Sequence, residues 1–302
     1  MQFSISVFEK LTSVQISQVK ALVNASTLVD EMAPLSEHVL IHINLGDGKF
    51  DEHILATSSS GELVGYLHLD KSDEVSGPVV EVVVHPQFRG QKVGTRLVEF
   101  AMNRLHDNRL RLWAHGELMS AYALAKKLGF TKARELWQMR RSLYAELPKL
   151  ELPANTKIRS FDFSKDKSDW LELNAKVFAA HPEQGRLDKA GLDIRLSETW
   201  FKQEGFLIST DDDGNFTGYN WTKIHGNSVG HPAIGEIYVL GVTPQMRGTG
   251  LGRALAIAGL EYLRGEGLAA AMLYVDRDNT SAVKLYEGIG FAHWDTDVMF
   301  QA

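Results

Sequence analysis

Residues 235–252 read Gly-Glu-Ile-Tyr-Val-Leu-Gly-Val-Thr-Pro-Gln-Met-Arg-Gly-Thr-Gly-Leu-Gly, and this stretch decides the fold. It begins as an apolar strand, turns at Pro244, passes through a basic glycine-rich loop and enters a helix that we expect over residues 253–265. Glycine tolerates unusual φ angles and has no Cβ, so the loop can turn several backbone N–H groups inward. The helix N-terminus adds the positive end of its dipole, and the combination predicts a pyrophosphate site.

A glycine-rich turn alone is also compatible with an ordinary strand–helix connection. It is not a Walker loop, since no Gly-Lys-Ser/Thr ends it, and no acidic residue follows at the spacing of a dinucleotide-binding fold. The motifs downstream are more specific: a strand at 273–276, a helix led by Asn279 that carries Tyr286, and Gly290-Phe291. Together with the loop they resemble the GCN5-related N-acetyltransferase (GNAT) superfamily. The resemblance implies that the loop holds the pyrophosphate of coenzyme A and that acetyl-CoA is the co-substrate.

Composition limits the remaining possibilities. At 302 residues the chain favours two domains, and 44% hydrophobic with 23% charged residues is typical of a soluble globular protein. No run approaches the ~18 apolar residues of a membrane helix, and residues 1–10 show no export signal. The absence of cysteine excludes disulfides, thiolate metal sites and a cysteine nucleophile, and it fits a reducing cytoplasm. A net charge of −6 argues against electrostatic binding to nucleic acid or anionic membranes.

The first half contains a fainter copy of the same stretch. Residues 79–94 run from a valine-rich strand through Pro86 and a basic loop into a helix over 95–106, and Gly129-Phe130 matches Gly290-Phe291. An internal repeat of this length implies two copies of one fold. We therefore predict an N-terminal GNAT-like domain over 1–147, a linker over 148–155 and a C-terminal GNAT domain over 156–302. Each is expected to be an α/β domain, a mixed twisted sheet flanked by helices.

Hydrophobic periodicity places the other elements. Helices are predicted over 12–25, 120–128, 169–178 and 188–199, and strands over 54–57, 63–69, 110–114, 206–209 and 216–224. Residues 133–143 are predicted to form a pair of strands.

The resemblance also locates the chemistry. In this superfamily two central parallel strands splay apart, and backbone N–H groups near the strand end polarise the thioester carbonyl as an oxyanion hole would. Leu240, Gly241 and Val242 occupy that position, with Val82, Val83 and Val84 as the N-terminal counterpart. Amine acetylation needs a base for the attacking amine and an acid for the leaving thiolate. Glu236 at the start of the strand is the predicted base, and Tyr286 is the predicted acid.

The two halves differ at these positions, and the C-terminal half is the predicted catalytic domain. Aligning Pro86 with Pro244 places Pro78 opposite Glu236, and the C-terminal alignment places Ala125 opposite Tyr286; neither can move a proton. Leu118 stands opposite Asn279, and Lys92 replaces the middle loop glycine, Gly250. Arg89, Gly90 and Gly94 remain, so whether the first domain binds acetyl-CoA stays open. A solvated Glu236 and a core Tyr286 are the duller alternatives.

The remaining predicted coenzyme contacts follow from the resemblance. In the loop and the helix after it they are Arg247, Gly248, Thr249, Gly250, Leu251, Gly252 and Arg253. In the Asn279-led helix they are Asn279, Thr280, Ser281, Ala282, Val283 and Lys284.

Over its whole length the chain resembles a family of tandem acetyltransferases that act on the cysteinyl amine of cysteinyl-glucosaminyl-inositol. The central block from Trp113 to Arg141 carries this resemblance more specifically than the loop does. Within it, residues 134–141 are better explained by inter-domain packing and salt bridges. The resemblance implies that the acceptor is surrounded by Glu37, Glu183, Lys223, Glu236 and Tyr274, with Glu37 reaching from the first domain. Glu183 could instead be merely solvated, and Lys223 could only extend its amine to water.

Two other functions remain open on the sequence alone. One is a GNAT enzyme that acetylates another amine, a peptide N-terminus or an aminoglycoside. The other is a non-catalytic acetyl-CoA sensor, against which the Glu236 and Tyr286 pair argues. His85, His115 and His181 follow no metal-ligand spacing, so no metal is expected. The expected partner is a small-molecule amine, and the expected state is a monomer.

Overall fold

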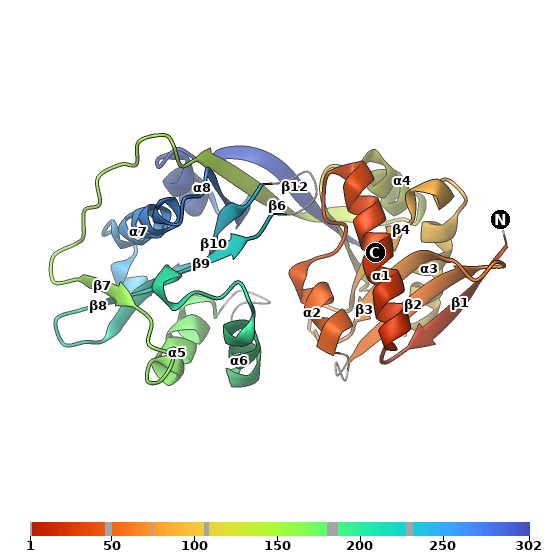
Figure 1. The fold of residues 1–302 in the computed structure, drawn as a ribbon, viewed down its shortest axis with the longest axis horizontal. Helices are drawn as coiled ribbons and strands as arrows, with labels where there is room; N and C mark the ends of the chain where they lie inside the picture. The colour runs from red at the N-terminus through yellow and green to blue at the C-terminus, as the bar shows by residue number, and fades with distance from the viewer. Residues whose placement is uncertain (1, 46–49, 74, 106–108, 180–186, 228–231) are drawn as a thin grey trace. The chain divides into compact units, whose positions relative to one another are not determined.

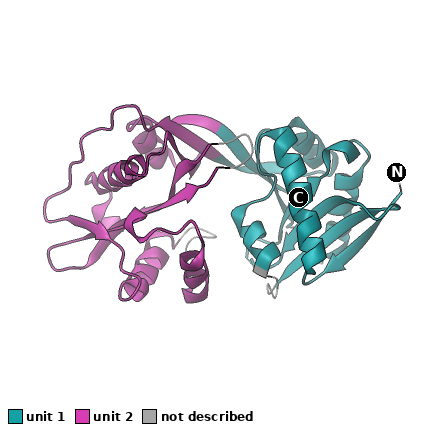
Figure 2. Ribbon diagram, in the orientation of Figure 1, with its two compact units in different colours: residues 1–136, 295–302 teal, residues 137–294 magenta. Residues whose placement is uncertain are grey.

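The computed structural model describes residues 2–45, 50–73, 75–105, 109–179, 187–227 and 232–302. The chain forms two compact units, shown in Figure 2: unit 1 contains residues 1–136 and 295–302, and unit 2 contains residues 137–294. Both are mixed α/β sheets flanked by helices, as predicted.

Unit 1 is built on the strand order β1-β2-β3-β4-β5-β12. Only β4 and β5 pair in parallel, and the other neighbours are antiparallel. Its elements, visible in Figure 1, are β1 (Phe3–Phe8), α1 (Ser13–Asp30), α2 (Glu37–Leu45), β2 (Asp51–Ser58), β3 (Leu63–Asp70), β4 (Val79–Val84), η1 (Pro86–Phe88), α3 (Val93–Arg104), β5 (Arg111–Ala114) and α4 (Met119–Lys127).

The two faces of this sheet bury separate cores because side chains alternate along a strand. Ile54 and Leu67 belong to the core under α3 and α4, whereas Leu55 and Tyr66 belong to the core under α1 and α2. All four side chains are at most 4% exposed, so strands β2 and β3 are covered on both faces. Helix α1 corresponds to the helix predicted over 12–25, and strands β2 and β3 correspond to the predicted strands over 54–57 and 63–69.

Unit 2 repeats the arrangement with the strand order β6-β11-β10-β9-β8-β7. Helices α7 and α8 cover one core, and α5 and α6 cover an aromatic-rich core around Trp170 and Trp221. Its elements are β7 (Lys157–Ser160), α5 (Lys167–Val177), α6 (Lys189–Ser197), η3 (Gln203–Gly205), β8 (Phe206–Thr210), β9 (Phe216–His225), β10 (Ile234–Val242), η4 (Pro244–Met246), α7 (Leu251–Gly265), β11 (Ala270–Asp276) and α8 (Thr280–Glu287).

The last strand of each repeat departs from expectation. Residues 133–143 do not form a strand pair: residues 133–142 belong to one strand, β6 (Thr131–Ser142), because no turn interrupts it, and Leu143 follows its end. The end of the chain forms β12 (Ala292–Gln301), whose residues 298–301 pair antiparallel with β5 in unit 1. The boundary between the compact units consequently falls inside β6 and β12. The predicted boundaries at 147 and 156 separate the two sequence repeats. That they are also the boundaries of two domains stays a prediction.

Candidate active site

The central strands of unit 2 separate at one end. Strands β10 and β11 pair in parallel from Gly235 with Ala271 to Ile237 with Leu273. Strand β10 continues to Val242, and Leu240, Gly241 and Val242 remain paired with β9 on its other side. The described pairing with β11 does not continue beyond Ile237, so this last part of β10 has an edge facing away from β9. The expected splay of the two parallel strands is present at this position.

A β-bulge lies at the point of separation. The β9–β10 register shifts between Ile237 and Val239, which leaves Tyr238 as an extra residue. A bulge disrupts the hydrogen-bond ladder and re-aims the neighbouring groups, and bulges are enriched near active sites. Strands β3 and β4 of unit 1 pair without a shift. The alignment predicted from the sequence is wrong by one residue before the bulge, because β10 has an extra residue at the bulge that β4 lacks. The strand pairing places Val79, not Pro78, at the position of Glu236.

The loop before α7 has the conformation that its glycines permit. Gly248 and Gly250 have φ angles of 75° and 93°. Gly250 is the N-cap of α7 and has no side chain to bond the first N–H groups of the helix. The predicted pyrophosphate contacts from Arg247 to Gly250 are all exposed. The Leu251 N–H donates to the Thr249 hydroxyl at 3.4 Å, and the N-cap residue itself offers no side chain. An exposed glycine loop that leads into such a helix fits an anionic group.

Helix α8 and the loop side of α7 are tied together. The Asn279 side chain caps α8 by accepting a hydrogen bond from the Ala282 backbone at 3.2 Å and another from the Ser281 hydroxyl at 3.0 Å. Arg253 Nη1 donates to the Gly288 carbonyl at 3.0 Å. Asn279 and Arg253 therefore have structural roles in addition to the coenzyme contacts predicted for them.

The predicted base, Glu236, is 6% exposed, and its Oε2 lies 2.6 Å from His225 Nε2. These two residues come from neighbouring strands, where Glu236 stands opposite Lys223 and His225 stands opposite Ile234. His225 is a site residue that sequence reasoning missed. The signal was its place two residues after Lys223 on the same face of a predicted strand, but that strand was predicted to end at Ile224.

Lys223 extends its amine over aromatic rings. Its Nζ lies 4.6 Å from the ring centroid of Trp200 and 5.2 Å from that of Tyr238, within the range of cation–π attraction. The hydroxyl of Tyr238 accepts a hydrogen bond from Arg195 Nε at 3.1 Å. Lys223 is 7% exposed, so its amine does not simply reach into water. The structure thus groups Lys223, Glu236 and His225 at one part of β9 and β10.

The predicted acid, Tyr286, is 8% exposed and packs edge-to-face on Phe291 with ring centroids 5.8 Å apart. Burial raises its pKa to about 12. The hydroxyl is therefore protonated at neutral pH and can donate, which is the state that a general acid needs. Tyr286 also lies in the core that α7 covers, and a purely structural role for this residue predicts the same position.

The other predicted acceptor contacts are more dispersed. Tyr274 is 40% exposed, and its hydroxyl accepts a hydrogen bond from Gln138 Nε2 at 2.8 Å. Gln138 belongs to the block that carried the whole-chain resemblance, so part of that block supports a predicted site residue. Glu37 is the first residue of α2 in unit 1. Glu183 lies outside the described residues. The predicted position of the acceptor between domains stays a prediction.

The corresponding loop of unit 1 is chemically different. The Arg89 guanidinium donates to both carboxylate oxygens of Asp30, at 2.7 and 2.6 Å, and also to the Ser26 hydroxyl and the Val84 carbonyl. Lys92 has φ 67°, the left-handed conformation that Gly250 has in unit 2. The turn is retained at a cost of about 1–2 kcal/mol for a residue with a Cβ, but the arginine that would meet a pyrophosphate is already paired.

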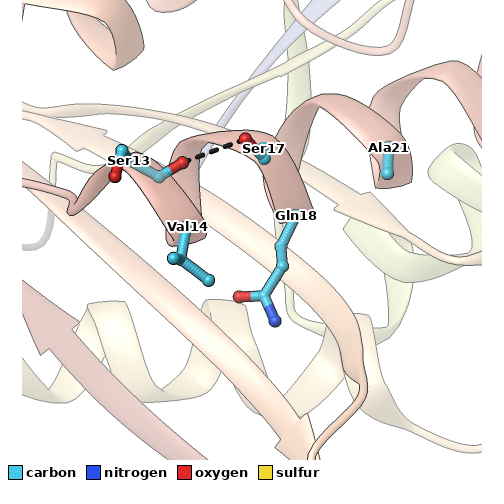
Figure 3. Close-up of a pocket in the computed structure, with 5 residues that line it drawn as sticks. All are labelled: Ser13, Val14, Ser17, Gln18 and Ala21. Atoms are coloured by element: carbon cyan, nitrogen blue, oxygen red, sulfur yellow. Dashed lines mark hydrogen bonds between the residues drawn. The ribbon is translucent and has the colours of Figure 1, made fainter.

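A separate hollow lies along the outer side of α1, lined by Ser13, Val14, Ser17, Gln18 and Ala21 (Figure 3). All five residues belong to one helix, and the Ser17 hydroxyl donates to the Ser13 carbonyl at 3.0 Å. None of the predicted site residues lines this hollow, and we assign it no role.

Comparison with known proteins identifies the family of this fold. Residues 169–291 match the model of the acetyltransferase (GNAT) family, and residues 50–132 match that of an acetyltransferase (GNAT) domain. A mycothiol acetyltransferase of Acidothermus cellulolyticus is 45% identical, with 97% of this chain and 92% of that protein covered. The mycothiol acetyltransferase of Salinispora arenicola is also 45% identical, with 97% and 95% covered.

The chain belongs to the mycothiol acetyltransferase family. Solved structures show the same tandem fold at lower identity. A tandem GNAT protein from the clavulanic acid biosynthesis pathway matches with a TM-score of 0.75 and 19% identity, covering 100% of this chain and 98% of its own. A GCN5-related N-acetyltransferase from Sphaerobacter thermophilus matches with a TM-score of 0.72 and 22% identity, covering 99% and 95%. In the described part of this mycothiol acetyltransferase family member, no helix is long and apolar enough to cross a membrane.

Proposed function

We propose that this chain is a mycothiol synthase, which transfers acetyl from acetyl-CoA to the cysteinyl amine of cysteinyl-glucosaminyl-inositol in the final step of mycothiol biosynthesis. Its 45% identity to mycothiol acetyltransferases over nearly the whole chain supports the acceptor. The observation that carries the chemistry is the bulge at Tyr238 beside the separated strands of unit 2. Unit 1 has separated strands without the bulge, with Ala125 opposite Tyr286 and with Arg89 paired to Asp30. We assign catalysis to unit 2.

The proposed mechanism is direct transfer in a ternary complex. Acetyl-CoA supplies an activated thioester. Glu236 accepts the proton of the attacking amine through a water molecule, and His225, whose Nε2 lies 2.6 Å from the carboxylate, takes this proton from Glu236 and releases it to solvent. Backbone N–H groups in residues 240–242 polarise the thioester carbonyl. Tyr286 donates its proton to the leaving thiolate. A covalent enzyme intermediate is not expected, because the chain has no cysteine.

Binding is assigned to the remaining predicted residues. The loop at residues 247–253 and the start of α8 at residues 279–284 would hold the pyrophosphate and pantetheine of the coenzyme. Lys223, Tyr274, Glu37 and Glu183 would surround the sugar and inositol hydroxyls, since carboxylates accept such bonds and lysine and tyrosine donate them.

Mass spectrometry of the acceptor after incubation with acetyl-CoA, with and without the enzyme, tests this function. We expect an acetyl mass gain on the cysteinyl amine, located by fragmentation. A dye that reports released thiol is unsuitable because the acceptor carries its own thiol. No gain while coenzyme binding is intact would exclude the acceptor and favour an enzyme for another amine. Binding without transfer to any amine of a broad library would identify an acetyl-CoA sensor.

A further inference from the structure

Unit 1 contains a cluster of histidine and aspartate side chains that the proposed chemistry does not use. It lies between α2 and the strands β2 and β3, and its members are His38, His42, Asp51, His53, His68 and Asp70. Four of the chain's 11 histidines are in this one place, and none of the cluster's members is a predicted residue of the acetyl-transfer site.

Secondary structure aims these side chains at one another. His38 and His42 are four residues apart on α2, so they occupy one face of the helix. On the sheet, Asp51 stands directly opposite Asp70, and the next residues on the same face, His53 and His68, also stand opposite each other. A helix with His-x-x-x-His spacing above a strand pair that carries aspartate and histidine is an arrangement suited to a metal ion.

The ligand atoms are close enough for one ion. One ring nitrogen each of His38 and His42 and an Asp51 oxygen lie within 4.8 Å of one another. Asp51 Oδ2 contacts His42 Nδ1, and Asp51 Oδ1 lies 3.4 Å from His68 Nε2. Ligand atoms about 2.0–2.1 Å from a tetrahedral Zn²⁺ are roughly 3.3 Å apart, so His38, His42 and Asp51 need only small adjustments. His68 is not part of this group and reaches it through Asp51.

The environment of His68, behind Asp51, is also unusual for a buried histidine. Its side chain is 2% exposed, yet among the described residues its Nε2 makes no hydrogen bond. A buried polar atom without a partner is costly and calls for an explanation such as an ion. A simple set of histidine–aspartate pairs would give this nitrogen a hydrogen bond to Asp51. Instead, Asp51 Oδ2 bonds to His42, and Asp51 Oδ1 lies near His68 Nε2 without forming a hydrogen bond with it.

We propose that His38, His42 and Asp51 form a binding site for a divalent transition-metal ion, with Zn²⁺ as the best match. Two imidazoles and one carboxylate are nitrogen and oxygen donors that Zn²⁺ accepts in tetrahedral sites, where water can take the fourth position. His38 Nε2 lies 3.3 Å from Asp70 Oδ2, so Asp70 is placed to orient this ligand. The His38 side chain is 50% exposed, which provides a path for entry. The ion would hold α2 against β2 and β3.

No metal is expected from the sequence because His85, His115 and His181 follow no metal-ligand spacing. The spacing of His38 and His42 becomes meaningful only when α2 forms, and this helix was not among the predicted elements. Asp51 joins the site only because α2 packs on β2. The site has no part in the proposed acetyl transfer, so its test is independent of activity.

The direct test is metal binding by the untagged full-length protein. After treatment with a chelator, Zn²⁺ is titrated by calorimetry, and Co²⁺ is titrated by visible absorption. We expect one equivalent of Zn²⁺ per chain and Co²⁺ bands of tetrahedral intensity. Thiolate bands cannot arise, because the chain has no cysteine. Bound Zn²⁺ should also raise the Tm of the apoprotein.

Variants locate the site. His38→Ala removes a half-exposed ligand, and Asp51→Asn keeps the shape of a buried one; each should weaken Zn²⁺ binding at least about tenfold. His293→Ala, an exposed histidine in unit 2, is the matched control and should bind as the wild type does. Failure of the wild-type protein to bind at about 100 μM Zn²⁺ would overturn the proposal. Unchanged affinity in both cluster variants would also overturn it, because the ion would then be elsewhere.

Discussion

Glu236 and Tyr286 are the residues on which the proposed chemistry depends. Proton transfer by a positioned side chain contributes about 10²–10⁴-fold to rate, so Glu236→Gln and Tyr286→Phe should each lower kcat by about 10²-fold. Neither change should weaken acetyl-CoA binding, because neither residue is expected to hold the coenzyme's pyrophosphate. Turnover measured by mass spectrometry and coenzyme binding measured by calorimetry separate the two effects.

Tyr262→Phe is the control for the tyrosine variant. Burial also raises the pKa of Tyr262 to about 12, but this residue lies at the opposite end of α7 from the glycine loop. It should retain wild-type turnover. Rates near wild type for both Glu236→Gln and Tyr286→Phe would refute their assignment as base and acid.

His115 joins two carboxylates inside unit 1. Its Nε2 lies 3.1 Å from Glu81, and its Nδ1 lies 2.9 Å from Asp297. Burial opposes the imidazolium, but the Glu81 and Asp297 carboxylates outweigh it and raise the pKa of His115 to about 10 from 6.5. Because the folded pKa is the higher one, the stabilisation is complete below about pH 6.5 and is lost as the pH rises toward about 10.

The free energy of unfolding should therefore fall with pH in this window, by up to about 1.4 kcal/mol per pH unit from this group. Guanidinium chloride titrations at pH 6.5, 8 and 9.5 measure the slope for the wild type and for His115→Gln. The variant should be less stable at pH 6.5 and should show a shallower decline. Parallel profiles would mean that His115 is not charged in the folded protein.

At the scale of elements, the last residues of β10 depend on close packing against α5. A Cβ on Gly241 would lie 2.8 Å from Val177 Cγ1 and 3.2 Å from both Phe178 and Tyr219. Gly241→Ala should therefore lower the free energy of unfolding by about 1–3 kcal/mol, as overpacking does. It should also lower kcat, because residues 240–242 are the proposed oxyanion donors.

Gly265→Ala at the end of α7 is the matched control, since a Cβ there meets nothing within 4 Å. Chemical denaturation and steady-state kinetics on both variants make the comparison. If Gly241→Ala matched Gly265→Ala in stability and turnover, tight packing of β10 against α5 would not be required.

At the scale of the whole molecule, the end of the chain completes the sheet of unit 1. Phe300 is 4% exposed, pairs with Leu112 of β5 and packs edge-to-face on Tyr122 of α4, with centroids 5.2 Å apart. Phe300→Ala should remove about 3–5 kcal/mol of stability, a typical loss for a buried aromatic residue. The loss should appear in unit 1, although Phe300 belongs to the second sequence repeat.

Hydrogen exchange followed by mass spectrometry can locate the effect. Faster exchange is expected in α3, α4 and β5, with α7 and α8 much less affected. Gln301→Ala, at the end of the same strand, is the control and should leave exchange in α4 unchanged. Faster exchange confined to unit 2 would contradict the strand order of unit 1.

The sequence by itself determined the repeat, the fold class and the main parts of the candidate site. These features follow from local patterns: alternation and periodicity predicted most helices and strands, and the glycines at 248 and 250 predicted the loop, whose φ angles are positive as glycine allows. The relation between Asn279 and Tyr286 could likewise be predicted, because both residues belong to one helix and its N-cap. The resemblance supplied the acetyl transfer, and family membership agrees with it.

Only the tertiary structure decided the features that depend on residues far apart in the chain. The bulge at Tyr238 exists only through the pairing of β10 with β9, and it moved the counterpart of Glu236 to Val79. Arg89 meets Asp30 across 59 positions, and His115 meets Asp297 across 182. The pairing of β12 with β5 also joins residues that are far apart in the chain. Period-two patterns specify which face of a strand is buried but not which strand lies beside it, because that choice depends on non-local contacts.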